Sequence, residues 1–336
     1  MQFAMKKLIF FTFVLILTGL LPWGARAAEP TTFLDVPRSH EFFLPIQYFS
    51  AQEVIRGYED NTFKSDNPVN RAEALKLILT AAATTLPTTL DRVPFGDMTV
   101  DDWFARYVVA GVEAKVISGE GDQKTFSPGR QVNQAEFLKM LFLANKVDVS
   151  GFAKTDAPSD TWFAPFIGTA TQLGIIASAN PTQFLTRGES LEMMYLLMLV
   201  KKGKDTQFLL SRAEENLSQI EVYIAANRVD LAKKASALAV DISQQALKNK
   251  PQNSVVLGGA KLARAYDFLV DAFQLGIAKK FTEAADKANQ AIAKATEAWE
   301  ANKVTEPVSK HIKDRAREIL NQVGGQETPA ANSLTK

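Results

Sequence analysis

The chain has 336 residues, of which 46% are hydrophobic and 22% charged, an ordinary globular composition with enough length for two or more folding units. With a formal net charge of +1, the chain lacks the surplus of basic residues that would neutralise the phosphates of a nucleic acid, so we expect no nucleic-acid partner. The chain contains no cysteine, which excludes disulfides, thiolate nucleophiles and zinc–thiolate sites.

The first residues have the pattern of a secretory signal. Lys6 and Lys7 precede an apolar run at 8–21, and a small-x-small cleavage site follows at 25–27. An uncleaved membrane anchor is the alternative, but the run is shorter than the ~20 residues that span a bilayer. We therefore predict a signal peptide at 1–28 and a secreted mature protein with no membrane segment.

Three segments of the front half share one internal spacing, which indicates a repeat. They are residues 31–86, 91–148 and 152–200. Each is predicted to hold a first helix that runs from a Glu or Trp to an isoleucine 14 residues later. These pairs are Glu41 with Ile55, Trp103 with Ile117, and Trp162 with Ile176.

A turn follows each first helix. Gly57 and Gly119 stand in this turn in the first two segments, and glycine suits a helix end that needs positive φ. The third segment has Ser178 there. We expect each turn to close on an aromatic residue, namely Phe63, Phe126 or Phe184.

Each second helix is predicted to begin with a capping box. An Asn or Thr is followed three positions later by Glu, so the cap side chain accepts from the third helical amide and the Glu accepts from the amide of the cap. The pairs are Asn70 with Glu73, Asn133 with Glu136, and Thr186 with Glu189. Three boxes at matching positions indicate three helix starts.

Capping does not account for the arginines that follow two of the caps. Arg71 and Arg187 occupy the first helical position, where the positive end of the helix dipole makes a cation mildly unfavourable. From the residues alone two explanations are open. The arginine forms a salt bridge between repeats, or it holds an external anion together with free helix-terminal amides.

Together these motifs resemble the S-layer homology domain over residues 31–200. The resemblance is carried by Phe33-x-Asp35-Val36, by the turn at 57–63 and by the helix start at 69–73. It implies an all-α fold in which three repeats pack as a pseudo-threefold spindle with grooves between them. It also implies that the grooves bind an acidic secondary cell-wall polysaccharide, often with a pyruvylated sugar.

The same resemblance assigns roles to residues. The motif arginine contacts the negative charge of the ligand and the turn glycine lets the ligand approach, which favours the external anion, with Arg71 as the safest assignment. Gln134 replaces the arginine in repeat two and predicts a weak groove, and the shortened repeat three is the most doubtful binder. A core position is the simpler expectation for both tryptophans. The candidate polysaccharide-binding residues are Arg71, Arg187, Gln134, Gly57, Gly119, Trp103 and Trp162.

The back half has the pattern of consecutive amphipathic helices. Residues 201–206 are predicted to be a linker, and apolar residues recur at helical spacing over 207–323. Short connections between such helices predict an antiparallel bundle. Two of the connections weakly resemble tetratricopeptide hairpins. Residues 324–336 are predicted to be a disordered tail.

No motif of a known catalytic chemistry is present, and the two histidines, His40 and His311, lack a ligand-like context. We therefore expect no enzyme activity, no cofactor and no metal. The prediction is a secreted cell-surface protein anchored non-covalently to acidic cell-wall polysaccharide, which displays a helical interaction domain to a protein partner. The alternatives are a structural or adhesive surface-layer subunit, or a wall-anchored hydrolase with its activity in the C-terminal half.

Overall fold

The structure is a computed structural model that describes residues 33–122, 124–151 and 161–324. Within these ranges the secondary structure is helical, with isolated β-bridges and no sheet, so the predicted all-α class is confirmed. The predicted signal peptide, the residues that open the third repeat and nearly all of the predicted tail lie outside the described residues.

The front half consists of three units of two helices each. They are α2 (Phe43–Ala51) with α3 (Arg71–Ala81), α4 (Ala105–Glu113) with α5 (Gln134–Ala144), and α6 (Ala164–Gln172) with α7 (Arg187–Lys201). The first helix of each unit packs on the second helix of the preceding unit: α4 on α3, α6 on α5, and α2 on α7. Because the last of these contacts returns to the first unit, the three units form a closed ring.

The backbone closes the same ring at the centre. The amide of Val69 donates to the carbonyl of Leu185 at 3.0 Å, Leu185 donates to Val132 at 3.0 Å, and Val132 donates to Val69 at 3.2 Å. Each of these residues comes directly before the cap of a second helix, and all three are fully buried. This cycle gives the front half the pseudo-threefold arrangement expected from the repeat.

Each second helix starts at the predicted cap. Asn70 Oδ1 accepts from the amide of Glu73 at 2.9 Å, and Glu73 Oε2 accepts from the amide of Asn70 at 3.0 Å. The same reciprocal bonds occur between Asn133 and Glu136 and between Thr186 and Glu189.

The first helices end differently from the expectation. The left-handed residue after each helix is Glu53, Lys115 or Gly174, with φ of 55°, 57° and 68°. Its amide and the next one bond back to the last helical turn, as in the Schellman motif. The left-handed position therefore precedes the turn glycines, and Gly57 itself does not have a positive φ.

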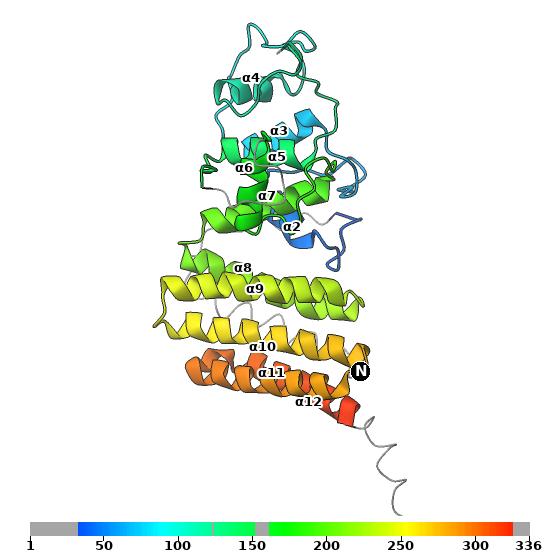
Figure 1. Ribbon diagram of the computed structural model, residues 1–336, viewed down its shortest axis with the longest axis vertical. Helices are drawn as coiled ribbons and strands as arrows, with labels where there is room; N and C mark the ends of the chain where they lie inside the picture. Colours follow the sequence, from blue (N-terminus) through cyan, green and yellow to red (C-terminus); the bar gives the residue numbers. More distant parts are fainter. Residues whose placement is uncertain (1–32, 123, 152–160, 325–336) are drawn as a thin grey trace, which may run out of the picture.

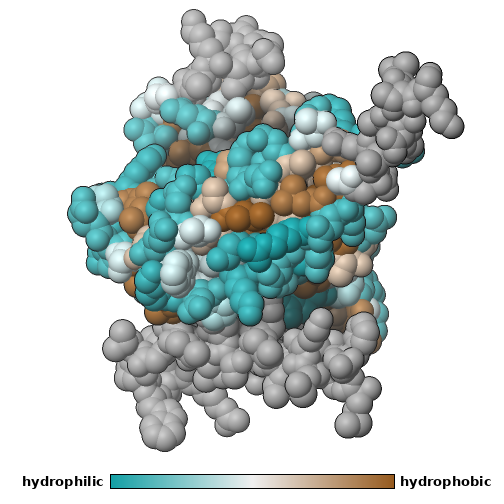
Figure 2. Space-filling model, turned by 90° about the horizontal axis from the view of Figure 1, so that it is seen from below, coloured by the Kyte–Doolittle hydropathy of each residue, from teal (hydrophilic) through white to brown (hydrophobic). Residues whose placement is uncertain are grey.

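The back half is a stack of antiparallel helices (Figure 1). Its elements are α8 (Thr206–Ala225), α9 (Val229–Asn249), α10 (Ser254–Ile277), α11 (Phe281–Ala301), a 3₁₀ turn at Lys303–Thr305, and α12 (Glu306–Gly324). The pairs α8–α9 and α10–α11 form hairpins, α9 packs on α10, and α12 packs on α11. Seen from the α12 end, the surface is mostly polar with a narrow apolar band across it (Figure 2).

The predicted linker is a short, fixed connection. Helix α7 runs to Lys201, α8 begins at Thr206, and the carbonyl of Gly203 accepts from the Asn249 side chain at 2.7 Å. Leu209 and Ala213 of α8 belong to the same apolar cluster as the front half. The two halves therefore share a core, because the apolar face of α7 is completed by α8 and α9.

Candidate functional site

The ring of units creates three equivalent corners. Each corner combines the turn and second helix of one unit with the Trp or Glu of the next unit and the Arg or Gln of the preceding unit. The first corner contains Gly57, Lys76, Trp103 and Arg187; the second contains Gly119, Lys139, Trp162 and Arg71; the third contains Ser178, Glu192, Glu41 and Gln134. All seven predicted binding residues therefore lie at the corners, but in combinations that cross repeat boundaries.

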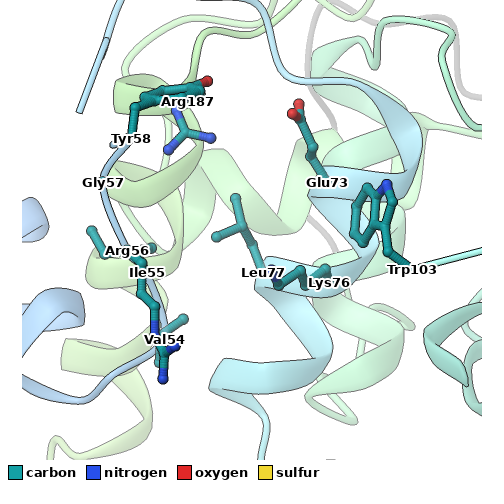
Figure 3. Close-up of a pocket in the computed structure, with 10 residues that line it drawn as sticks. All are labelled: Val54, Ile55, Arg56, Gly57, Tyr58, Glu73, Lys76, Leu77, Trp103 and Arg187. Atoms are coloured by element: carbon teal, nitrogen blue, oxygen red, sulfur yellow. The ribbon is translucent and has the colours of Figure 1, made fainter. Parts of the chain in front are cut away.

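The first corner contains an open cavity of about 220 Å³. The turn at 54–58 forms one wall and α3 forms the other, with Trp103 beside α3 (Figure 3). Three of the predicted residues meet here, namely Gly57, Trp103 and Arg187. The full lining is Val54, Ile55, Arg56, Gly57, Tyr58, Glu73, Lys76, Leu77, Trp103 and Arg187.

Arg187 reaches this cavity from the third unit. Its Nε donates to the carbonyl of Phe63 at 3.1 Å, and its guanidinium carbon lies 4.6 Å from the centre of the Phe63 ring and 5.2 Å from that of Tyr58. These contacts hold the side chain against the turn while the guanidinium points toward the cavity (Figure 3). An immobilised, half-buried guanidinium is well suited to bind a carboxylate.

The tryptophans are not core residues, in contrast to the simpler expectation. Trp103 is 55% exposed and Trp162 is 52% exposed. The neighbouring Phe104 fills the core position in the second unit. Its ring is edge-on to that of Trp103, with the two ring centres 5.4 Å apart. A lysine from the preceding unit lies over each indole. The Nζ of Lys76 is 5.4 Å from the ring centre of Trp103, and the Nζ of Lys139 is 5.1 Å from that of Trp162. Each exposed indole offers a flat face beside a cation.

The helix-terminal amides are not free, so the expectation of a joint amide and guanidinium anion site does not hold. The amide of Arg71 donates to the carbonyl of Arg130 at 2.8 Å, and that of Arg187 donates to Asn67 at 2.9 Å. The second amide of each helix also bonds to a loop carbonyl, and the third bonds to the cap. Only the arginine side chains are left for a ligand.

Gly57 has a packing role. A Cβ at this position would lie 2.5 Å from Cε1 of Phe33 and 2.7 Å from the carbonyl oxygen of Thr62. The structure therefore explains this glycine by contacts inside the first unit, and the predicted role in ligand approach is not needed to account for it.

The second corner is more closed than the first. Arg71 is only 7% exposed, donates through Nη2 to the carbonyl of Ser118 at 3.1 Å, and lies 5.2 Å from the centre of the Phe126 ring. Burial lowers the pKa of its guanidinium, and the carboxylate of Glu120 opposes that effect. Gly119 belongs to the same turn, so both predicted residues lie together at this corner.

The third corner lacks both the arginine and the tryptophan. The Gln134 side chain accepts from the amide of Asn180 at 2.9 Å and so fixes the turn of the third unit. Glu192 pairs with Lys234 of α9, and Glu41 lines the same gap between the two halves. The back half therefore packs beside this corner, where Glu192 occupies the position of the lysines and Glu41 that of the tryptophans.

Phe184 does not close a turn as predicted. It is 55% exposed, whereas Phe63 and Phe126 are buried. Phe184 directly precedes Leu185 of the hydrogen-bonded cycle and forms an isolated β-bridge with Asn133. Pro68 and Gln131 take the equivalent position in the other two units. Repeat three is shorter between turn and helix, and the missing stretch is the one that carries the buried aromatic residue.

Several residues of the corners were missed from the sequence. Lys76 and Lys139 lie five positions after Arg71 and Gln134, so aligning the second helices would have found them. The positions of Tyr58, Glu120 and Arg130 carry different residue types in the other repeats, so no shared pattern marks them. Their importance depends on which unit they face.

The family model for the S-layer homology domain matches residues 32–75 and 94–138, which are the first two units. The chain is 26% identical to an S-layer protein of Bacillus licheniformis over 178 residues, 51% of this chain and 20% of the relative. It is 24% identical to the middle cell wall protein of Brevibacillus brevis over 190 residues, 56% of this chain and 17% of the relative. It is 25% identical to S-layer protein EA1 of Bacillus anthracis over 178 residues, again 51% of this chain and 20% of the relative.

The chain thus spans about a fifth of the length of these relatives. The family model matches two of its units, and the third takes the equivalent place in the hydrogen-bonded ring. Among the described helices, none is both long and apolar enough to cross a bilayer. In the same part of the chain, no group of three acidic, histidine or cysteine side chains is arranged to hold a metal ion.

Proposed function

We propose that this protein is held at the cell surface by binding an acidic cell-wall polysaccharide in the first corner. The observation that carries the proposal is the cavity lined by Arg56, Lys76 and Arg187, in which the one acidic lining residue, Glu73, is already engaged by the helix cap. The family match of the first two units and the cell-wall and S-layer names of the relatives support it.

The chemistry of the cavity favours a sugar that bears a carboxylate, such as a pyruvylated sugar. The guanidinium of Arg187 and the ammonium of Lys76 supply charge-assisted hydrogen bonds to the carboxylate. The exposed indole of Trp103 supplies a flat apolar surface for a sugar ring. Because the cavity holds both cations and an aromatic face, it favours a ligand that has both a carboxylate and a sugar ring.

The remaining parts of the proposal concern the whole protein. Residues 1–28 direct secretion, the corner binds its ligand without a catalytic step, and the stacked helices of the back half are held outward to meet a protein partner. The short connection at 201–206 and the shared core hold these helices in a fixed position relative to the wall-binding corner.

The test is sedimentation of the mature protein with purified cell-wall material. Arg187→Ala and Lys76→Ala are each expected to reduce the bound fraction, with Arg187→Ala weakening the apparent affinity about tenfold or more, because a charge-assisted hydrogen bond contributes about 1.5–3 kcal/mol. The control is Arg317→Ala on α12, an exposed arginine far from the corner. Binding should also weaken as salt is added. Unchanged binding by Arg187→Ala would contradict the proposal.

The names of the relatives favour a second candidate, a subunit that assembles into a surface layer. This function requires contacts between copies of the chain, which wall binding does not. Light scattering of the purified mature protein distinguishes the two, since only the second candidate predicts particles that grow with concentration. Zymography on wall material tests the proposed lack of hydrolase activity, because clearing would reveal it.

A further inference from the structure

The second corner has the same framework as the first but a different distribution of charge. We infer that Glu120 is a built-in counter-ion that takes the place of the ligand carboxylate in the second corner, so that the chain binds acidic sugar at the first corner only. This inference rests on the proposed function and names the residue that decides which corner is active.

Glu120 is held in place by Arg130. Arg130 Nε donates to Glu120 Oε2 at 3.2 Å, and Nη2 pairs with Glu120 Oε1. The same guanidinium donates to both oxygens of Glu136, at 2.9 Å and 3.0 Å. Arg130 therefore bridges the turn and α5 across the corner, and its charge is used internally.

The matching positions of the first corner are uncharged. The amide of Tyr58 donates to Thr62 in the turn as that of Glu120 donates to Thr125, each at 2.8 Å, so Tyr58 and Glu120 are equivalent. Asn67 and Arg130 are likewise equivalent, because each carbonyl accepts from the first helical amide of the facing unit. The first corner thus lacks both partners of the bridge and keeps its cavity.

Arg71 in the second corner is more buried than the equivalent Arg187 in the first. Arg71 is buried and its Nε has no hydrogen-bond partner, whereas Arg187 in the first corner is only half-buried. Although burial raises the pKa of the Glu120 carboxyl, the hydrogen bond from Arg130 and the charge of Arg71 lower it overall. The ionised Glu120 therefore occupies Arg130 and offsets part of the charge of Arg71, the two guanidinium groups that an incoming carboxylate would need.

An external carboxylate at this corner would have to displace Glu120 from Arg130. The exchange would only replace one carboxylate on Arg130 with another, and it would leave the displaced Glu120 near the new carboxylate in a partly buried site. Separating a partly buried ion pair is unfavourable unless both members find new partners. The exposed Trp162 and the half-buried Lys139 are consequently left without an accessible guanidinium beside them.

The two corners can be observed separately through their tryptophans. The probe is the methyl glycoside of a pyruvylated sugar, titrated into the ¹⁵N-labelled mature chain while the indole N–H signals of Trp103 and Trp162 are followed. In the wild type only Trp103 is expected to shift. In Glu120→Tyr/Arg130→Asn, which carries the residues of the first corner, both signals should shift.

Three variants complete the design. Adding Arg71→Ala to the double variant should abolish the Trp162 shift and leave that of Trp103 intact. Glu120→Gln, which keeps the shape of the side chain, serves if the double variant does not fold by circular dichroism. Glu59→Gln, an exposed carboxylate in the first turn, is the control and should leave the Trp162 signal unmoved.

The outcomes separate the inference from the proposed function. A wild-type Trp162 shift, or a folded Glu120 variant in which Trp162 stays unmoved while Trp103 shifts, overturns the inference alone. Absence of any Trp103 shift in the wild type contradicts the proposed function, and the inference falls with it.

Discussion

The guanidinium of Arg187 lies 4.6 Å from the ring of Phe63, which precedes it by 124 residues. This contact joins the third unit to the first and fixes the arginine that the third unit contributes to the cavity of the first corner. The cavity is assembled from all three units, since Lys76 comes from the first, Trp103 from the second and Arg187 from the third. Any change that separates the third unit from the first also removes the cation from the cavity.

Gly57→Ala should destabilise the front half. The added methyl would meet the Phe33 ring and the carbonyl of Thr62 at less than 3 Å, and the carbonyl is backbone that cannot rotate away. We expect a loss of about 1–3 kcal/mol in the free energy of unfolding, measured by urea denaturation. Gly129→Ala is the control, because a methyl group there has open space around it. Equal midpoints for the two variants would contradict the packing role of Gly57.

Lys115→Gly should stabilise the protein. Lys115 has a φ of 57° at the end of α4, where an L-residue is strained and glycine is not. The side chain is exposed, so little contact is lost. We expect a gain of about 0.5–1 kcal/mol in the free energy of unfolding, because relief of the left-handed strain, roughly 1–2 kcal/mol, exceeds the entropic cost of glycine, roughly 0.5–1 kcal/mol. Lys115→Ala removes the same side chain but keeps the strain, so its thermal midpoint should stay near that of the wild type.

The capping boxes make a third prediction. Asn70→Ala removes the acceptor for the amide of Glu73 and should cost about 1 kcal/mol of stability, as measured by thermal unfolding. Asn70→Asp keeps an acceptor oxygen at the positive end of α3 and should be close to neutral. If both variants lose the same stability, the cap is not what fixes this helix start.

Asp267 should make the back half sensitive to acid. Burial raises the pKa of its carboxyl, but hydrogen bonds from Lys233 at 2.7 Å and Ser236 at 2.9 Å outweigh that effect and lower the pKa below 3.8. Since the folded state has the lower pKa, this contribution to stability is complete above about pH 5 and is lost as the pH falls through 4 and below.

Asp267→Asn should therefore cost about 2 kcal/mol at pH 7, the range of a hydrogen bond to a charged group, and flatten the fall in stability between pH 5 and 3. Chemical denaturation at a series of pH values measures both effects. The exposed pair of Asp314 with Arg317 is the comparison, and Asp314→Asn should change stability little at any pH. A parallel pH profile for wild type and Asp267→Asn would disprove the role of this carboxylate.

The parts of the fold that could be predicted from the sequence are those with a local physical cause. A capping box lies within four residues, so Asn70 with Glu73 is visible without knowledge of any partner. Helix periods and the Ala-rich stripe of α11 are equally local, because burial follows the period of 3.6 residues. The ring closure by Leu185 and Val69 was implied only through the family resemblance.

The state of each corner could not be predicted, because it depends on residues of different units. Arg71 and Arg187 occupy identical positions in their helices, yet one is buried beneath Glu120 and the other faces a cavity beside Tyr58. The prediction that the tryptophans are core residues was wrong for a different, local reason. The adjacent Phe fills the core, and nothing in the spacing says which of two neighbouring aromatic residues turns inward.

The cycle of hydrogen bonds among Val69, Val132 and Leu185 has a consequence for synthesis of the chain. The amide of Val69 bonds to a carbonyl that leaves the ribosome more than a hundred residues later. Neither of the first two units can complete its buried polar pairing until the third has emerged. The front half should therefore reach its final form in one late, concerted step, and a nascent chain stalled before Leu185 should remain sensitive to protease.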